Sequence, residues 1–454
     1  MSIASVNPAT GETLRSFVPH GAADIDRILA GAFNAQARWS ATPFAERAVP
    51  MRRLAELLRE RGPALARLMA LEMGKPLKDG IAEAQKCALA CEHYANTAER
   101  GLAPRNIATD ASRSYVRHDP LGVVLAVMPW NFPFWQVFRF IAPNLMAGNG
   151  GVLKHASNVP QCALAIEGLV QDAGFPPGLF QSLLVGSGAV AGLIADPRIA
   201  AVTLTGSELA GREVGQAAGR ALKPVVLELG GSDPFIVLAD ADVALAAETA
   251  ARARNINAGQ SCIAAKRFIV DDAVHDDFVV RLVAAMKKVR VGDPMDSATD
   301  IGPQARVDLR DELQRQVESA VRQGASCVLG GKVMPGPGAY YPPTVLIGVA
   351  PGNLAYTEEI FGPVATVIRA RDAEDAIAIA NDTRFGLGAS LWTRDPGLAD
   401  LLIPLIQAGS VFVNGMVKSD PQLPFGGIKA SGVGRELGVE GLRAFVNIKT
   451  VWIR

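Results

Sequence analysis

The chain has 454 residues with 45 basic and 45 acidic side chains, and 49% of its residues are hydrophobic. This length suits two or three domains, while the zero net charge provides no basic surface for nucleic acid. No apolar run is long enough to span a membrane, and the first residues lack the charged and apolar regions of a signal peptide. Five scattered cysteines without a CxxC pair predict a reducing, cytoplasmic location and no metal site.

Residues 22–100 are predicted to be helical, because apolar residues recur there at i, i+3, i+4 spacing with charges between them. From about Leu121, short apolar runs such as "LGVVLAVMP" and "PVVLELGG" alternate with helical stretches, and a second series runs from about Asp233 to Asn414. Continuous apolar strands separated by helices are typical of parallel βαβ units. The pattern predicts an α/β fold with two parallel-sheet lobes. The final "RAFVNIKTVWIR" predicts a strand that forms, with "SYVRHDP", a projecting arm completed by another subunit.

Two glycine turns are candidate phosphate sites. "LLVGSGAVAG" places Gly186 and Gly188 after a strand but lacks the third glycine of a dinucleotide fingerprint, so a tight turn is at least as good an interpretation. In "VTLTGSELAGREVG", Thr205, Gly206 and Ser207 stand where a strand gives way to a helix. Thr205 or Ser207 can cap that helix, and its free N–H groups would favour a phosphate.

Two polar residues interrupt the apolar stretch "VMPWNFPFWQVFRFIAPNLMAG". Asn131, at a change from strand to helix, is interpreted either as a helix cap or as a hydrogen-bond donor to an oxyanion. Arg139 lies on an otherwise apolar helix, and a buried guanidinium needs an anionic partner. It forms either a structural ion pair or a clamp for a substrate carboxylate.

An acid and a thiol form a second pair of candidates. Glu228 ends the apolar strand in "VVLELGG", where an acid is either hydrogen-bonded structurally or keeps a tunable proton. Cys262 lies in "NINAGQSCIAAKR", after small and polar residues that bring a backbone close to a ligand. Packing, a disulfide, a metal ligand and a nucleophile are the alternatives for this thiol. A nucleophilic thiolate needs a base or a positive field, and Glu228 is a candidate base, directly or through water.

Six motifs occur in the order found in the aldehyde dehydrogenase superfamily: "PWNFP", "LTGS", "ELGG", "GQSC", "EEIFGPV" and "PFGGIKASGVGRE". The chain resembles that superfamily over essentially its whole length, from "NPATGE" onward, and within it is most similar to NADP-preferring succinate-semialdehyde dehydrogenases. The resemblance implies a Rossmann-type cofactor domain in residues 1–112 and 132–228. It also implies an α/β catalytic domain in 229–425 and a small β oligomerisation arm in 113–131 and 426–454.

The resemblance implies roles for the candidate residues. Cys262 matches the nucleophile that attacks the aldehyde to form a thiohemiacetal, which becomes a thioester when hydride leaves for the nicotinamide. Asn131 matches the side-chain donor of an oxyanion hole that the Cys262 backbone N–H completes, and Glu228 matches the base that activates water for hydrolysis. Positions that match cofactor contacts are Trp130, Lys154, Gly206, Ser207, Glu359 and Phe361.

Two departures from the family pattern bear on specificity. In "LKHASN", Ser157 replaces an acid that takes the ribose hydroxyls in many members, while Lys154 supplies charge. Serine can donate to a 2′-phosphate that a carboxylate would repel, which favours NADP over NAD. Some members that oxidise succinate semialdehyde carry an arginine where this chain has Ile256. Arg139 matches their other carboxylate-binding arginine, and Ser419 matches a polar position of the substrate pocket.

The resemblance therefore predicts oxidation of succinate semialdehyde to succinate with NADP, with NAD possible, by a cytoplasmic homodimer or homotetramer. The expected partner is a small aldehyde that carries a carboxylate, with no nucleic acid, membrane or metal. One alternative is an NAD-linked dehydrogenase of another short aldehyde such as glutarate semialdehyde. The other is a non-catalytic structural relative, against which Cys262, Glu228 and Asn131 argue.

Overall fold

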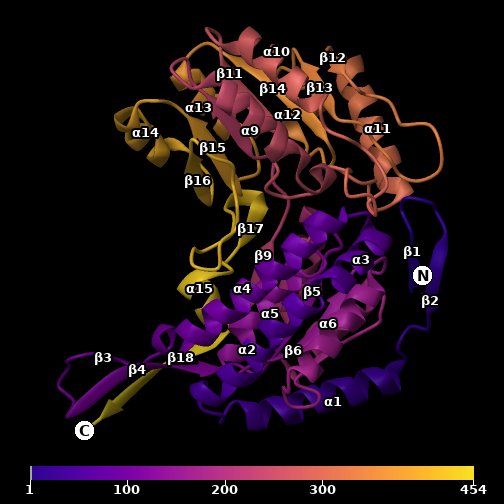
Figure 1. Cartoon of the computed structure of the whole chain (residues 1–454). Helices are drawn as coiled ribbons and strands as arrows, with labels where there is room; N and C mark the ends of the chain where they lie inside the picture. Colours follow the sequence, from indigo (N-terminus) through magenta and orange to yellow (C-terminus); the bar gives the residue numbers. More distant parts are fainter. Residues whose placement is uncertain (1–2) are drawn as a thin grey trace.

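The computed structural model describes residues 3–454, which form two α/β lobes and a projecting arm (Figure 1). The lower lobe in this view contains a six-stranded sheet in the order β17-β9-β8-β5-β6-β7, in which only β17 runs antiparallel to its neighbour. Its strands are β5 (Val123–Met128), β6 (Gly150–His155), β7 (Phe180–Ser182), β8 (Ile199–Thr205), β9 (Val225–Glu228) and β17 (Gly432–Val433).

Apolar residues on both faces explain why helices cover both sides of this sheet. In β5, Val124 and Ala126 pack into one core, while Val123 and Leu125 pack into the other. The first core is covered mainly by α2 to α6, and the second by α1, α7 and α8. These helices are α1 (Ala22–Trp39), α2 (Phe44–Glu60), α3 (Gly62–Met73), α4 (Leu77–Gly101), α5 (Trp135–Met146), α6 (Pro160–Asp172), α7 (Val190–Ala195) and α8 (Glu208–Arg220).

The upper lobe contains a seven-stranded sheet in the order β12-β13-β14-β11-β10-β15-β16, in which only β12 is antiparallel. Its strands are β10 (Pro234–Val237), β11 (Arg267–Asp271), β12 (Ser326–Leu329), β13 (Thr344–Ile347), β14 (Val364–Ala370), β15 (Gly388–Trp392) and β16 (Ser410–Val413). One face packs on α9 (Val243–Asn255) and α10 (His275–Met286). The other packs on α11 (Val307–Arg322), α12 (Leu354–Thr357), α13 (Ala373–Asn381) and α14 (Pro396–Leu402).

The arm pairs β18 (Val446–Ile453) with β4 (Arg113–Pro120) in antiparallel register, and β3 (Arg105–Asn106) adds a short strand. This is the pairing that the sequence predicted. The arm strand ends at Pro120, however, and not at residue 131, because the next strand, β5, joins the six-stranded sheet. Strand β17 likewise pairs with β9 rather than with the arm. The other domain boundaries stay predictions.

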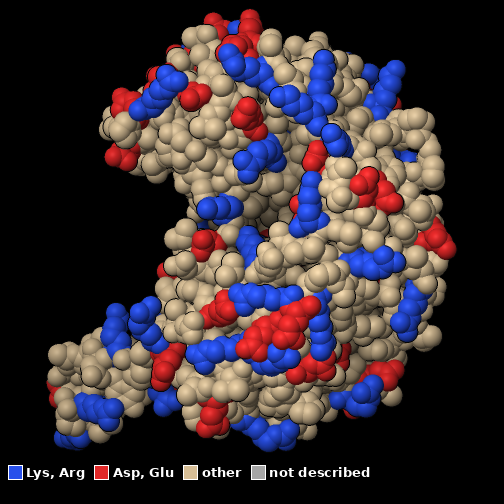
Figure 2. Space-filling view, in the orientation of Figure 1, with Lys and Arg blue, Asp and Glu red and all other residues tan. Residues whose placement is uncertain are grey.

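The remaining elements are the hairpin of β1 (Ile3–Val6) and β2 (Thr13–Phe17), the helix α15 (Gly438–Arg443) and four short 3-10 turns. Basic and acidic side chains are mixed over the face seen in Figure 2, in keeping with the zero net charge. Within residues 3–454, no helix combines the length and apolarity that a membrane crossing requires.

Candidate active site

A cavity of about 280 Å³ is lined by both lobes and lies beyond the carboxyl ends of β5, β8 and β9. Ligands of open parallel sheets bind at such edges. The cavity brings together seven of the site residues predicted from the sequence, namely Trp130, Asn131, Gly206, Ser207, Cys262, Glu359 and Phe361. The Trp130 and Phe361 rings meet edge to face, with centroids 5.9 Å apart. Of the helix caps considered for this region, Ser207 is the one observed, because its side chain accepts the Ala210 N–H.

The loop that carries Cys262 has an unusual backbone. Asn257, Ala258 and Gly259 have φ values of 54°, 55° and 75°, so three consecutive residues are left-handed. This conformation costs a non-glycine residue roughly 1–2 kcal/mol, and such strain persists only where surrounding contacts fix it. A Cβ at Gly259 would lie 2.1 Å from the carbonyl carbon of Gly362. The loop is therefore pressed against the segment that carries Phe361.

Lys266 holds the other end of this loop. Its ammonium group donates to the carbonyl oxygens of Ser261, Cys262 and Ala264 at 3.0, 2.8 and 3.1 Å, and it lies 3.3 Å from the Glu359 carboxylate. Sequence reasoning did not single out Lys266. Its place after the nucleophile, at the start of a buried strand, was the available signal, since a buried lysine needs partners.

Two N–H groups at the Cys262 cavity are candidates for the predicted oxyanion site. The Asn131 Nδ2 donates one hydrogen bond to the Gln260 carbonyl at 3.0 Å, and the Asn257 Nδ2 donates to the Asn131 carbonyl at 2.7 Å. The second Asn131 N–H is thus available, and the Cys262 backbone N–H donates to no acceptor in the described chain. The capping alternative for Asn131 does not hold, because α5 begins four residues later and its first N–H groups bind Glu83.

Burial shifts the pKa of both the thiol and the acid upward. Burial raises the pKa of the Cys262 thiol to about 12, although Arg139 and Lys266 oppose the change. Burial also raises the pKa of Glu228 well above its usual range, and the nearby Glu436 adds to this effect. Glu228 is 2% exposed and neither carboxylate oxygen has a hydrogen-bond partner in residues 3–454. Of the two interpretations of Glu228, the structure favours the tunable proton, but the side chain lies outside the lining of the Cys262 cavity.

Arg139 is not directed into that cavity. Its guanidinium group forms an ion pair with Glu436, donates to the Thr205 hydroxyl at 3.2 Å and stacks over the Phe425 ring. Arg139 is 2% exposed. The arrangement favours the structural ion pair over the substrate clamp, and the clamp role stays a prediction.

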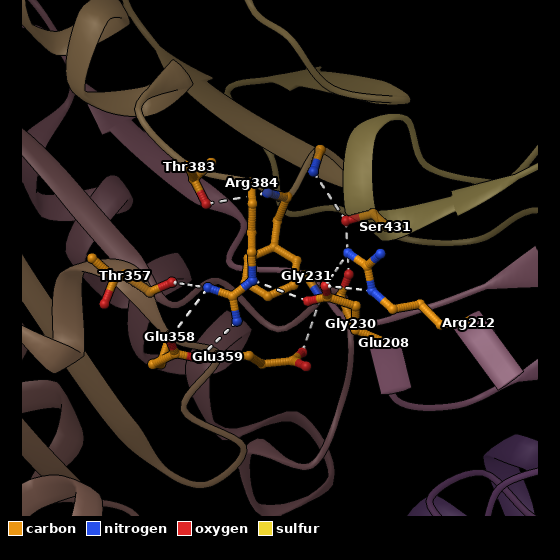
Figure 3. A network of polar contacts seen from close by, with 12 residues as sticks. Glu208, Arg212, Gly230, Gly231, Thr357, Glu358, Glu359, Thr383, Arg384 and Ser431 are labelled. Carbon is orange, nitrogen blue, oxygen red and sulfur yellow. Dashed lines mark hydrogen bonds and ion pairs between the residues drawn. The ribbon is translucent and has the colours of Figure 1, made fainter. Parts of the chain in front are cut away.

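Glu359 is held in place by contacts from both lobes. Its carboxylate accepts the Gly231 N–H at 3.0 Å, and the adjacent Glu358 binds Arg384 at 2.7 Å (Figure 3). The same guanidinium group binds Glu208 on α8 at 3.0 Å. Arg384 therefore ties a helix of the lower lobe to the segment that carries Glu359. The contact of Glu359 with the cofactor stays a prediction.

A second cavity, of about 760 Å³, is lined by the predicted cofactor residues Lys154 and Ser157 together with the N-terminal hairpin. Lys154 is 8% exposed and no residue of the described chain binds its ammonium group. Burial lowers the pKa of Lys154 because the charge lacks compensation. The α6 helix is preceded by Val159 as its cap, so Ser157 does not serve as the helix cap considered for it. A buried cation and a free hydroxyl facing a large cavity fit a phosphate group.

Ser419 lies apart from the two cavities. It is 8% exposed and its hydroxyl oxygen accepts hydrogen bonds from Lys86 at 2.7 Å and from the Trp135 indole at 3.1 Å. Lys86 was not singled out from the sequence, because a lysine on an amphipathic helix is usually a solvated residue.

The chain is similar to known proteins over its whole length. Residues 1–451 match the aldehyde dehydrogenase family. A probable succinate-semialdehyde dehydrogenase (NADP+) of Synechocystis sp. is 54% identical over 453 residues and 100% of both chains, and succinate-semialdehyde dehydrogenase (NADP+) 1 of Mycobacterium tuberculosis is 53% identical over 100% of both. The crystal structure of succinic semialdehyde dehydrogenase from Streptococcus pyogenes with NADP+ superposes with a TM-score of 0.97, at 36% identity and 99% coverage of both chains. The chain belongs to the aldehyde dehydrogenase family.

Proposed function

We propose that this chain oxidises succinate semialdehyde to succinate with NADP+. The observation that carries the proposal is the Cys262 thiol beside two free N–H donors in the first cavity. Residues of both lobes line this cavity, and they also line the second cavity, which contains Lys154 and Ser157. The names of the relatives from Synechocystis and Mycobacterium support the substrate and the cofactor. The free cysteines support a reducing cytoplasmic location.

The chain's own groups supply the covalent chemistry. The Cys262 thiol loses its proton to solvent, its sulfur bonds to the aldehyde carbon, and the electron pair of the carbonyl double bond moves to the oxygen, which becomes an oxyanion. The Cys262 backbone N–H and the second N–H of Asn131 can donate to this oxygen, a contribution that is typically worth 10²–10³ in rate. Bound NADP+ supplies the acceptor for the hydride that the thiohemiacetal loses, which leaves a thioester on Cys262.

Glu228 supplies the base for the second half of the reaction. As a carboxylate, after its proton has passed to solvent, it takes a proton from water. The water oxygen attacks the thioester carbon, the carbon–sulfur bond breaks, and succinate and the Cys262 thiolate are released. The raised pKa makes the carboxylate a stronger base than a solvated glutamate. Neither carboxylate oxygen has a hydrogen-bond partner in residues 3–454 that would hold the side chain away from the thioester.

The arm supports a homo-oligomer, which we propose as a dimer or tetramer. Strand β18 leaves Ile448 and Trp452 exposed at 65% and 49%, a site where another subunit could pack. Size-exclusion chromatography with light scattering tests this assembly, and a monomer at micromolar concentration contradicts it.

Steady-state kinetics test the function. The purified enzyme is assayed with succinate semialdehyde, glutarate semialdehyde and butanal, each with NADP+ and NAD+. The highest kcat/KM is expected for succinate semialdehyde with NADP+. A higher value for another aldehyde or for NAD+ overturns that part of the proposal, and absence of turnover with every pair supports the non-catalytic alternative.

A further inference from the structure

The loop that carries Asn131 is held mainly through its carbonyl groups. It runs from Pro129 to Pro133, between β5 and α5, and a proline has no N–H to donate. In residues 3–454, the N–H groups of positions 130–132 donate to no acceptor. Trp130 and Asn131 both line the Cys262 cavity. Groups that bind the carbonyl oxygens of this loop therefore decide where the Asn131 amide lies.

His155, the last residue of β6, is one of these groups. Its Nε2 atom lies 2.9 Å from the Pro133 carbonyl oxygen, and its Nδ1 atom lies 2.9 Å from the Ala156 nitrogen. His155 is the register partner of Met128 at the end of β5, whose carbonyl oxygen is 3.3 Å from Nδ1. The side chain is buried, since His155 is 6% exposed. The ring thus joins the 129–133 loop to the turn that follows β6.

Only one form of the imidazole ring suits these contacts. The Ala156 N–H is a donor, so Nδ1 accepts it and carries no hydrogen, and Nε2 carries the hydrogen and donates to the Pro133 carbonyl. The other neutral tautomer would direct two N–H groups at each other and a lone pair at a carbonyl oxygen. Burial lowers the pKa of His155 to about 4, although the carbonyl oxygens of Pro133 and Met128 oppose the change. The ring is therefore neutral near pH 7, with its hydrogen on Nε2.

The two hydrogen bonds of the ring lead to different cavities. Pro133 is two residues after Asn131, whose second N–H is a candidate donor to the oxyanion. Ala156 and Ser157 line the second cavity, where a phosphate group fits. A shift of about 1 Å in a positioning contact can change a rate by two orders of magnitude. One buried ring is thus placed to fix both the oxyanion donor and the phosphate site.

We infer that His155 is a positioning residue, which holds the Asn131 amide towards the reacting oxygen through Pro133 and holds the turn at Ser157 through Ala156. This inference rests on the proposed function. Asn257 donates to the Asn131 carbonyl at 2.7 Å, so the Cys262 loop supports one part of the 129–133 loop and His155 supports the other.

Two amide substitutions separate the two hydrogen bonds of the ring. In His155→Asn, the side-chain oxygen can take the place of Nδ1 and keep the bond from Ala156, but the bond to Pro133 is lost. The rate of the NADPH burst should fall by about 10- to 100-fold for succinate semialdehyde and butanal alike, while KM for NADP+ changes by less than about threefold. In His155→Gln, the amide nitrogen can take the place of Nε2. This variant should recover most of the burst rate and raise KM for NADP+ by about three- to tenfold, because the Ala156 N–H loses its acceptor.

A double substitution tests whether His155 acts through Asn131. Asn131→Ala combined with His155→Asn should have the same burst rate as Asn131→Ala alone, because the donor that His155 positions is already absent. Losses that multiply overturn the inference, and so do equal effects of the Asn and Gln substitutions at position 155. His20→Asn is the matched control and should keep the parental values, since the His20 Nδ1 also accepts a backbone N–H but lies outside the lining of both cavities.

NMR of the imidazole nitrogens tests the contacts without depending on activity. With ¹⁵N-labelled histidine, the signal that disappears in His155→Gln should show a neutral ring with hydrogen on Nε2, unchanged between about pH 6 and 9. A hydrogen on Nδ1, or titration near pH 6.5, overturns the inference even if neither variant folds. If the parent enzyme oxidises no aldehyde with NADP+, the proposed function fails and the role of His155 fails with it. With an active parent, unchanged kinetics in His155→Asn overturn the role of His155 alone.

Discussion

The two reacting groups of this enzyme are held in opposite ways. The Cys262 loop is fixed by three left-handed residues, by the Asn257 amide and by the three bonds that Lys266 donates. Glu228, by contrast, ends a strand whose backbone is well paired while its carboxylate oxygens bind nothing in residues 3–454. The proposed nucleophile is therefore positioned through its backbone, and the proposed base is left free in its side chain. A group that acts once, on a fixed carbon, benefits from rigidity, whereas a base that must reach water and then exchange its proton benefits from movement.

Removing the nucleophile should produce the largest effect. Cys262→Ala deletes the sulfur and leaves the loop contacts, which come from backbone oxygens. We expect dehydrogenase activity to fall by at least about 10⁴-fold, with the melting temperature and the affinity for NADP+ close to those of the parent. Stopped-flow absorbance and calorimetry measure these quantities. Normal turnover would falsify the covalent mechanism.

Replacing the base should separate the two halves of the reaction. Glu228→Gln keeps the size of the side chain but cannot accept a proton. We expect a burst of NADPH of about one equivalent per site, followed by a steady state that is slower by about 10²–10⁴-fold. Rapid-mixing kinetics report both phases. Equal loss of the burst and the steady state assigns Glu228 to activation of the thiol instead.

The rigidity of the Cys262 loop can be tested by a change in its backbone. Gly259→Ala places a Cβ against Gly362 at a left-handed φ, and we expect a loss of roughly 2–4 kcal/mol in the free energy of unfolding and of about 100-fold in kcat/KM for every aldehyde. Gly186→Ala is the matched control, since no atom lies within 4 Å of its added Cβ and its φ is negative. Similar melting curves for the two variants contradict the strain argument.

A change outside both regions tests cofactor choice alone. Ser157→Glu places a carboxylate beside Lys154, where it repels a 2′-phosphate and accepts hydrogen bonds from free ribose hydroxyls. We expect the ratio of kcat/KM for NADP+ to that for NAD+ to fall by about 100-fold, with the burst kinetics of Cys262 preserved. Parallel assays with the two cofactors measure the ratio. A parental ratio in the variant places phosphate recognition elsewhere in the 760 Å³ cavity.

Much of the fold could be predicted from the sequence. The continuous apolar runs predicted the two parallel sheets, because a strand that is buried on both faces does not alternate apolar and polar residues. The helical pattern of residues 22–100 was also predicted. Strand β13 (Thr344–Ile347) was not predicted, since it follows a loop rich in glycine and proline and is only four residues long. The arm boundary that the resemblance implied was placed too late, although the continuous apolar run "LGVVLAVMP" indicates a strand of the parallel sheet, which begins after only two residues.

The site was predictable where local motifs place a group at a strand end. Trp130 and Asn131 follow the carboxyl end of β5, where ligands of parallel sheets bind, and Cys262 reaches the same cavity on the loop between α9 and β11. The ion pair of Arg139 with Glu436 and the contact of Lys86 with Ser419 each join positions about 300 residues apart or more. Neither contact has a spacing that sequence alone can reveal, so the partners of Arg139 and Lys86 could not be predicted.

Arg384 gives the molecule a mechanical property. Arg384 forms ion pairs with both Glu208 and Glu358, and so works as a strut between the lobes. A hinge motion that moves the lobes apart has to lengthen or break one of these ion pairs. The arginine side chain is 41% exposed, so dissolved ions weaken the strut. The buried reaction chemistry is shielded from those ions. Stiffness of the hinge, and with it the release of cofactor, is thus expected to respond to ionic strength while the bond-making steps do not.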